Sequence, residues 1–333
     1  MRTKPCRLDP WRAIGFRLLF ALGLVPAAQA DWLTDSQNIM GTRCSVELWS
    51  EDKARGEAAI ASVFADMHRI DRLMSTWKED TEISRVNREG SKHPVKVSEE
   101  LFRLLQESVK YSELTRGAFD ITYASVGYLY DFKKGVHPDQ KSIDAALPGV
   151  DWRQMVLDEK NFTVFFKRPG MRIDLGGIAK GHSVDKGIEI LRELGITRAM
   201  VNAGGDTRII GDRFGKPWVV GLRHPDQPGK SYLSVPIVDS AFSTSGDYER
   251  YFDEDGKRFH HIIDPKTGDS ARKIRAVTVI APTATRSDAL TKSVFIMGAE
   301  EGIRFINTLP DVDAVVVPLD GKVVYSERLS PAE

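Results

Sequence analysis

The sequence has few cysteines, no net charge and no long apolar run. Its 333 residues include two cysteines, Cys6 and Cys44, which excludes a cysteine-rich metal site. Lys plus Arg and Asp plus Glu each number 47, so the chain has no net field that attracts nucleic acid or an anionic membrane. No apolar stretch reaches the about 20 residues that a transmembrane helix needs. These absences favour a soluble globular protein that does not bind nucleic acid.

The first 30 residues have the pattern of a signal peptide. Residues 1–17 carry five Arg or Lys and one Asp, an apolar run follows, and residues 28–30 read Ala-Gln-Ala, a small-x-small cleavage pattern. Cys6 precedes the apolar run, so it cannot be the lipid-bearing cysteine of a lipoprotein. We therefore predict a signal peptide over residues 1–30 and an exported protein that begins near Asp31, without stable membrane insertion and without an intramolecular disulfide.

The rest of the chain alternates between helical and strand periods. Apolar residues recur at helical spacing over residues 60–74, and a second helix follows Ser98, which is a plausible N-cap. Two further helices are expected at about 178–194 and 288–297, and residues 133–150 read as a loop. Strand candidates are residues 44–50, 162–167, 171–175, 198–203, 218–222, 233–238, 259–264, 277–281 and 314–318. With no linker in sight, the pattern predicts an α+β fold, a mixed β-sheet flanked by helices, as one catalytic unit over residues 31–333.

A double glycine stands where a predicted strand passes into a helix, in "RIDLGGIAKGHSVDKGIEIL" at 172–191. Asp174 ends the strand, Gly176 and Gly177 remove side chains where a ligand approaches the backbone, and Lys180 adds a positive charge at a helix N-terminus that favours an anion. A purely structural role is equally open, since the glycines can serve only to turn the chain. The segment matches neither GxGxxG nor GxxxxGK[ST].

Two further segments carry candidate ligand groups. "VNAGGD" at 201–206 is a second glycine turn with a carboxylate beside it, and "STSG" at 243–246 offers three hydroxyls. His260 and His261 point to opposite faces of a strand, so at most one of them looks into a given cleft. Each histidine is either a hydrogen-bonded structural residue or a general base.

The segment "SDALTK" at 287–292 places Asp288 on one helix face with Thr291 and Lys292. Carboxylate and hydroxyl oxygens suit Mg²⁺, and a magnesium that also touches phosphates needs only one or two protein groups. The spacing of these residues alone is weak evidence for a Mg²⁺ site, because Asp288 can equally be a charge at the start of a helix.

Taken together, these segments resemble the ApbE family, whose motifs occur here in the same order over nearly the whole mature chain. They read "MGT" (40–42), "DRLMSTWKEDTEISRVN" (71–87), "GAFDIT" (117–122), "DLGGIAKGHSVD" (174–185), "NAGGD" (202–206), "STSGDYERYF" (243–252), "HHIIDPKTG" (260–268) and "SDAL" (287–290). The resemblance implies an exported, periplasmic FAD:protein FMN transferase. In that reaction a threonine hydroxyl of an acceptor flavoprotein attacks the FAD pyrophosphate, FMN stays on the acceptor through a phosphoester bond, and AMP leaves.

The resemblance also implies roles for individual residues. His261 is the base for the incoming hydroxyl, while the carbonyl of Gly177 and the side chain of Asp288 bind Mg²⁺. An aromatic ring such as Trp77, where the family often has Tyr, stacks on a flat ligand. The residues implied to contact FAD are Met40, Trp77, Ala118, Phe119, Asp120, Asp174, Lys180 and Ile263.

One residue departs from the family pattern. The family commonly has Thr four residues after the metal-binding Asp, whereas this chain has Lys292. Either Thr291 substitutes as a ligand with shifted geometry, or the ammonium replaces part of the charge of the ion. Since a protonated lysine repels a divalent ion, we predict a weaker dependence on Mg²⁺ than is usual in the family.

Three functions remain open at this point. The first is the transferase, whose acceptor by resemblance is a membrane-bound or exported flavoprotein with a threonine-containing flavinylation motif. The second is an FAD pyrophosphatase, which uses water as the nucleophile and releases FMN and AMP. The third is a periplasmic protein that binds FAD without turning it over.

Overall fold

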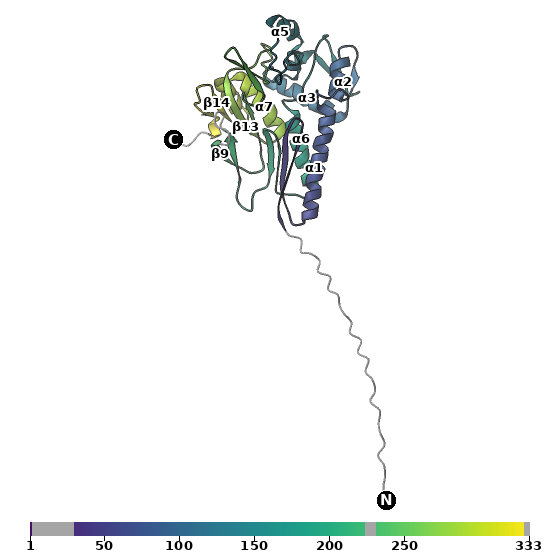
Figure 1. The fold of residues 1–333 in the computed structure, drawn as a ribbon, viewed down its shortest axis with the longest axis vertical. Helices are drawn as coiled ribbons and strands as arrows, with labels where there is room; N and C mark the ends of the chain where they lie inside the picture. The colour runs from purple at the N-terminus through teal and green to yellow at the C-terminus, as the bar shows by residue number, and fades with distance from the viewer. Residues whose placement is uncertain (2–29, 224–230, 330–333) are drawn as a thin grey trace.

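The computed structural model describes residues 1, 30–223 and 231–329 (Figure 1). The predicted signal peptide lies almost entirely outside the described residues. The α+β class is confirmed, but the pairings between the described strands are all antiparallel, so the expectation of a mixed sheet is wrong. The main sheet has the strand order β1 (Asp31–Ile39), β2 (Thr42–Ser50), β6 (Ala199–Ala203), β7 (Asp206–Ile210), β10 (Ala241–Gly246), β13 (Ile274–Ala281), β14 (Asp313–Pro318) and β15 (Val324–Tyr325).

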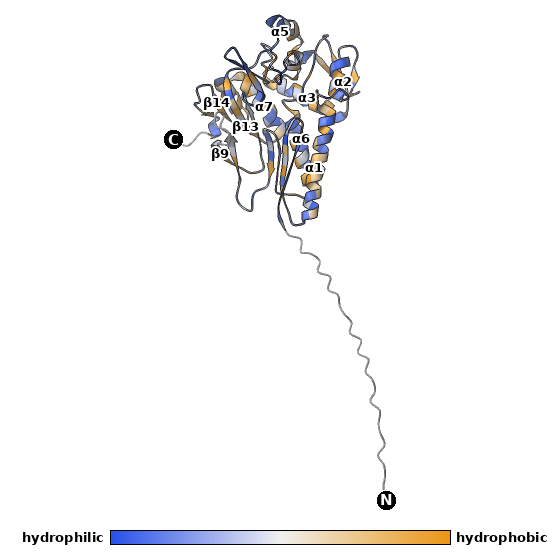
Figure 2. Ribbon diagram, in the orientation of Figure 1, coloured by the Kyte–Doolittle hydropathy of each residue, from blue (hydrophilic) through white to orange (hydrophobic). Residues whose placement is uncertain are grey.

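Both faces of the main sheet are covered. In β6, Val201 packs against helices on one face, whereas Met200 packs beneath a hairpin on the other, as strand alternation requires. The helices are α1 (Lys53–Met74), α6 (Ala179–Glu193), α7 (Ala284–Met297) and α8 (Ala299–Asn307), and the hairpin is β8 (Trp218–Arg223) and β9 (Ser231–Ile237). Figure 2 shows polar and apolar residues alternating along α1, as its amphipathic pattern predicts.

A second layer lies beside the sheet, at the top of Figure 1. It has its own apolar core, in which Leu101, Leu104 and Leu105 are buried as predicted, and Ser98 caps its long helix by accepting from the Leu101 N–H at 3.4 Å. Its elements are α2 (Glu82–Glu89), β3 (Val95–Lys96), α3 (Glu99–Leu114), η1 (Ile121–Tyr123), α4 (Ala124–Gly127), α5 (Gln140–Ala146), η2 (Leu147–Gly149), η3 (Trp152–Gln154), β4 (Met155–Asp158) and β5 (Thr163–Phe166). The chain also has the hairpin β11 (Tyr251–Glu254) and β12 (Lys257–His260), and η4 (Glu327–Leu329). Among the described residues, no helix is both long and apolar enough to cross a membrane.

Three local predictions are wrong. Residues 171–175 alternate in burial as expected but form no strand, because the side chain of Asn87 bonds both the N–H and the C=O of Ile173 (2.8 and 2.9 Å) where a partner strand would pair. The predicted loop at 133–150 contains α5, which Asp139 caps. Helix α7 begins at Ala284, capped by Thr283, so Asp288 lies in its second turn, fully buried, and is not a charge at the start of the helix.

Candidate active site

The site forms where the first turns of α6 and α7 meet. A Cβ atom on Gly181 would lie 2.3 Å from the carbonyl oxygen of Ala284, so only glycine allows this contact between the two helices. One turn further along α6, the carboxylate of Asp185 accepts from the N–H groups of Ala284 and Thr285 at 2.9 and 2.8 Å, which satisfies the free amides at the start of α7. The "AKGHSVD" segment thereby places Lys180 opposite Asp288.

Four charged side chains, Lys180, Asp206, Asp288 and Lys292, form what we call the charge cluster. The Lys180 Nζ lies 2.7 Å from Asp206 Oδ2 and 3.4 Å from Asp288 Oδ2, and the Lys292 Nζ lies 2.5 Å from Asp288 Oδ1. Neither oxygen of Asp206 receives a well-aligned hydrogen bond from the described residues, so its link to Lys180 is mainly electrostatic. The side chains of Asp206 and Asp288 are 2% and 0% exposed, against 22% and 17% for the two lysines, so the lysine side chains are the more solvent-accessible members of the cluster.

The two carboxylates of the cluster differ in their electrostatics. Burial, together with the neighbouring Asp288, raises the pKa of Asp206. Burial acts in the same direction on Asp288, but Lys180 and Lys292 outweigh it and hold the pKa of that carboxyl below its usual range. Asp288 is therefore the firmly ionised member of the pair, and it accepts from the Gly181 N–H at 3.1 Å as well.

Hydroxyl groups of β10 hold α7 in place. Ser243 and Ser287 share a hydrogen bond of 2.7 Å, and the Ser245 hydroxyl donates to Thr291 Oγ1 at 3.0 Å. Thr244 points to the other face and bonds Thr278. Two of the three hydroxyls that the sequence offered as ligand groups, those of Ser243 and Ser245, therefore serve the packing of the helix that carries Asp288. Similarly, the second glycine turn joins the antiparallel strands β6 and β7 and places Asp206 beside Lys180.

Of the residues expected to hold Mg²⁺, Asp288 and Thr291 are already engaged, and Lys292 packs against Gly177. The Thr291 hydroxyl donates to the Asp288 carbonyl at 2.7 Å, and the side chain of Lys292 covers Gly177, where an added Cβ would lie 3.3 Å from Lys292 Cγ. No group of three or more His, Cys, Asp or Glu in the described part of the chain could hold a metal ion. A divalent ion 4 Å from an ammonium is repelled by about 8 kcal/mol at an effective dielectric constant of 20. With Lys292 in this position, the donor set does not fit a divalent ion, and the metal-binding roles of Gly177, Asp288 and Thr291 stay predictions.

His261 carries an imidazole nitrogen without a partner. Its Nδ1 is buried and makes no hydrogen bond to any described residue, while its backbone N–H donates to the Arg250 carbonyl at 3.1 Å. Burial, with added repulsion from Arg250 and Lys292, lowers the pKa of His261 to about 3. The ring is thus neutral at pH 7, and it lies within electrostatic reach of Lys292.

His260, by contrast, is a structural residue. It is 2% exposed, its Nε2 lies 2.5 Å from the Ala271 carbonyl and its Nδ1 accepts from the Ile262 N–H at 3.3 Å. β12 ends at His260, so His261 lies just beyond the strand and the prediction of a strand over 259–264 holds only for its first two residues. Of the paired histidines, His261 is the one with a ring nitrogen that has no partner among the described residues.

Asp174 connects the turn after α1 to the double glycine. Its Oδ2 accepts from the Thr76 hydroxyl at 2.6 Å, and its Oδ1 accepts from the Tyr123 hydroxyl and the Gly176 N–H at 3.1 and 2.7 Å. Next to Thr76, the side chain of Trp77 is 83% exposed. Its ring has the Lys133 ammonium 6.0 Å away, so one aromatic face is open to a flat ligand.

The remaining predicted contact residues are mostly buried. Phe119 reaches the double glycine, with its Cε2 3.4 Å from the position of a Cβ on Gly177. Asp120 is occupied locally, since it accepts from the N–H and hydroxyl of Thr122 and from the Trp152 N–H, and burial raises its pKa. The others are Ala118 and Ile263, which lie in apolar clusters, and Met40, which is at the β1–β2 turn with φ 54°.

The structure therefore brings Phe119, Gly177, Lys180, Asp288 and Lys292 into one contact group. The His261 ring lies within electrostatic range of Lys292 and Arg250, and the Arg250 Nη2 lies 3.5 Å from the Gly41 carbonyl. The predicted site residues do not include Thr76, Tyr123, Asp206 and Arg250. Of these, Asp206 is the carboxylate noted beside the second glycine turn, and Thr76 and Arg250 lie inside recognised motifs, whereas nothing in the sequence distinguishes Tyr123.

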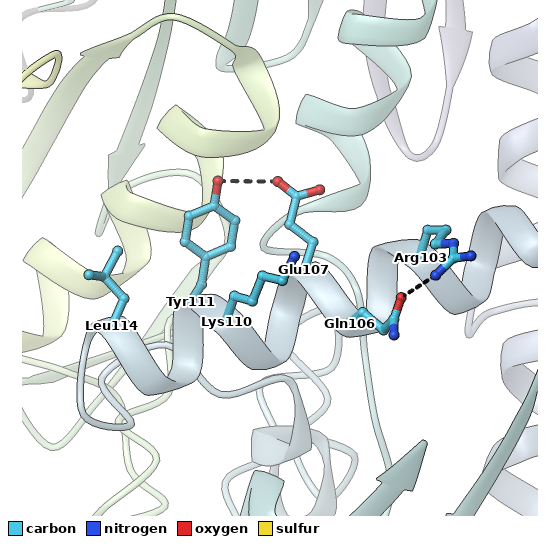
Figure 3. Close-up of a pocket in the computed structure, with 6 residues that line it drawn as sticks. All are labelled: Arg103, Gln106, Glu107, Lys110, Tyr111 and Leu114. Atoms are coloured by element: carbon cyan, nitrogen blue, oxygen red, sulfur yellow. Dashed lines mark hydrogen bonds between the residues drawn. The ribbon is translucent and has the colours of Figure 1, made fainter. Parts of the chain in front are cut away.

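A shallow groove lies elsewhere, along α3 (Figure 3). It is lined by Arg103, Gln106, Glu107, Lys110, Tyr111 and Leu114, and Figure 3 shows the Tyr111 hydroxyl directed at Glu107, to which it donates at 3.2 Å. None of these residues belongs to the predicted site. We therefore do not assign the groove to FAD.

The fold and the site define an α+β protein in which a glycine turn and a buried charge cluster present two ammonium groups beside a neutral imidazole. Such an arrangement can bind a phosphate ester and accept a proton next to it. Comparison with known proteins identifies the family. The model of the ApbE family matches residues 40–316, so the chain belongs to the ApbE family.

Individual relatives are similar to this protein over most of the chain. It is 32% identical over 305 residues to the FAD:protein FMN transferase of Klebsiella pneumoniae (strain 342), covering 89% of this chain and 93% of that protein. The FAD:protein FMN transferase of Treponema pallidum (strain Nichols) is 32% identical over 304 residues, covering 86% and 84%. Among solved structures, the ApbE protein of Thermotoga maritima has a TM-score of 0.83 at 32% identity, and the flavin transferase ApbE of Vibrio cholerae has 0.79 at 28%; each comparison covers 90% of this chain and 98% of the other.

Proposed function

We propose that this protein is an FAD:protein FMN transferase that moves FMN from FAD onto a threonine hydroxyl of an acceptor flavoprotein and releases AMP. The family membership supports the reaction class. The observation that carries the proposal to this site is the His261 Nδ1, a buried, unpartnered nitrogen on a neutral ring within reach of the charge cluster.

The chain's own residues account for the transfer as follows. His261 takes the proton of the acceptor threonine hydroxyl, while the oxygen of that hydroxyl forms a bond to the FMN phosphorus of FAD. The bond from that phosphorus to the bridging oxygen breaks, and AMP leaves with that oxygen. Positive charge at Lys180 and Lys292 stabilises the negative charge that develops on the phosphate groups. The open face of Trp77 supports the isoalloxazine or adenine ring.

The cation requirement, the acceptor motif and the location are parts of the same proposal. The family resemblance implies Mg²⁺, but the donor set beside Lys292 does not fit a divalent ion, so we propose a weaker dependence on Mg²⁺ than that resemblance implies. The acceptor is a flavoprotein with a threonine in its flavinylation motif. Export to the periplasm rests on the sequence of residues 1–30, and mass spectrometry of the mature N-terminus, expected near Asp31, tests it.

In-gel flavin fluorescence tests the proposed reaction. The protein is mixed with FAD and threonine-bearing candidate acceptors, and the products are separated on a denaturing gel. A fluorescent acceptor band that disappears with a Thr→Ala acceptor supports the transferase. AMP release without any acceptor, and without a labelled band, would instead identify a pyrophosphatase, and FAD binding without AMP release would identify a carrier.

A further inference from the structure

One lysine contacts Gly177 and Asp288, the two residues that the family resemblance assigns to a metal, and also Thr291, the possible substitute ligand. The Lys292 ammonium lies 2.5 Å from Asp288 Oδ1 and 3.2 Å from Thr291 Oγ1. Its aliphatic stem covers Gly177, where an added Cβ would lie 3.3 Å from Lys292 Cγ and 3.9 Å from Lys292 Cε. The side chain of Lys292 therefore fills the space between these groups.

We propose that the Lys292 ammonium is the resident cation of this site and binds the FAD diphosphate directly, so that FAD binding needs no divalent metal. The proposal rests on the proposed function, because FAD is the ligand. The buried carboxylate of Asp288 fixes the ammonium in place, as it would fix a metal ion. Unlike an exchangeable ion, this charge belongs to the chain.

The hydrogen-bonding capacity of Lys292 supports this role. An ammonium has three donors. Lys180 donates to Gly176 O and Asp288 Oδ2 at 3.3 and 3.4 Å, and its charge also pairs with Asp206 Oδ2, 2.7 Å away, without a well-aligned hydrogen bond. Lys292 donates to Asp288 and Thr291, so within the described residues its third N–H is free for a phosphate oxygen. Since 17% of its side chain is exposed, that N–H can reach a ligand.

The test compares FAD binding in EDTA and in Mg²⁺, using the mature protein without an acceptor and flavin fluorescence as the readout. The unmodified protein is expected to bind FAD with the same affinity in both buffers. The FAD affinity of Lys292→Thr is expected to fall about tenfold or more in EDTA, which is the worth of one charge-assisted hydrogen bond. It should recover in Mg²⁺, because Asp288 is then free to hold the ion.

A matched control and a direct metal readout sharpen the test. Lys186→Thr makes the same change on α6, where the lysine is paired with Glu189 at 2.7 Å and is 38% exposed, and it should behave as the unmodified protein does. Mn²⁺, followed by electron paramagnetic resonance as a stand-in for Mg²⁺, should bind to Lys292→Thr and not to the unmodified protein. Circular dichroism checks that each variant is folded.

The outcomes separate the two proposals. FAD binding by the unmodified protein that is lost in EDTA and restored by Mg²⁺ would overturn the role of Lys292 and leave the transferase standing. An unchanged FAD affinity of Lys292→Thr in EDTA would also overturn the proposed role of Lys292. Failure to bind FAD in either buffer would refute both proposals. If Lys292→Thr does not fold, the comparison of buffers with the unmodified protein still decides the question.

Discussion

The two buried carboxylates of the charge cluster offer a matched test of its electrostatics. Asp288 has a lowered pKa and Asp206 a raised one, so replacing each with isosteric Asn should have unequal effects. Asp288→Asn leaves the ammonium of Lys292 without its 2.5 Å partner and removes one of the two carboxylate partners of Lys180. Breaking a buried ion pair costs about 3 to 5 kcal/mol. Asp206→Asn removes a charge that its surroundings disfavour, so it should change the free energy of unfolding by no more than about 1 kcal/mol.

Urea unfolding at neutral pH, without FAD, measures both values as changes in the free energy of unfolding. Asp288→Asn should lower the midpoint far more than Asp206→Asn, with the slope unchanged. Equal losses, or a larger loss for Asp206→Asn, would refute the assignment of Asp288 as the firmly ionised member. The two substitutions have the same chemistry in the same cluster, so a general cost of disturbing the site cannot produce the difference.

The pH dependence has a definite sign for each carboxylate. Because the folded-state pKa of Asp288 is lowered, its contribution is complete above the ordinary value of 3.8 and is lost as pH falls through the folded value. The gap between the unmodified protein and Asp288→Asn should therefore narrow only at pH below about 4. For Asp206 the folded pKa is raised, so its ionised form destabilises the fold at neutral pH, and this cost is relieved as pH falls toward 3.8.

Three further substitutions test other parts of the site. His261→Gln should reduce acceptor flavinylation by about 10² to 10⁴-fold, the usual worth of a general base, with FAD affinity retained; full activity would exclude that role. Gly181→Ala places a methyl group 2.3 Å from the Ala284 carbonyl oxygen, and should cost about 1 to 3 kcal/mol in urea unfolding; an unchanged midpoint would show that α6 and α7 can separate freely. Trp77→Ala removes a ring that is 83% exposed, so it should leave stability unchanged but weaken FAD binding about tenfold, as loss of one stacking contact does; unchanged affinity in fluorescence titration would place the flavin and the adenine elsewhere.

Local signals in the sequence were enough to predict the four longest helices, α1, α3, α6 and α7, but not the strands β1, β7 and β10 of the main sheet. Ser98 caps α3 as its position before two glutamates indicated, and α1 buries the apolar stripe read from its period. The prediction of a strand at 171–175 failed although these residues do alternate in burial. It failed because the side chain of Asn87 forms hydrogen bonds with the backbone N–H and C=O of Ile173. That partner lies 86 residues away in the chain, so no local pattern reveals it.

The same distinction between local and distant partners explains the site. The contact between Asp288 and Lys292 follows from their spacing on one helix, and the structure has it at 2.5 Å. The contacts of Lys180 with Asp206 and Asp288, and that of Asp174 with Thr76, join segments far apart in sequence. They depend on how closely α6 and α7 approach, and the only local sign of that approach is the glycine at position 181.

The balance of charge in the cluster affects the stability of the site before a ligand binds. Two lysines and two aspartates sum to zero when all are ionised, so the fold can bury both carboxylates with their counter-charges supplied by the chain itself. With threonine at position 292, Lys180 alone would face both carboxylates, and the site would carry an uncompensated negative charge until a cation bound. Lys292 removes that requirement, because its ammonium is present from the moment the helix forms. The phosphate site would then stay ordered at every concentration of free divalent ions.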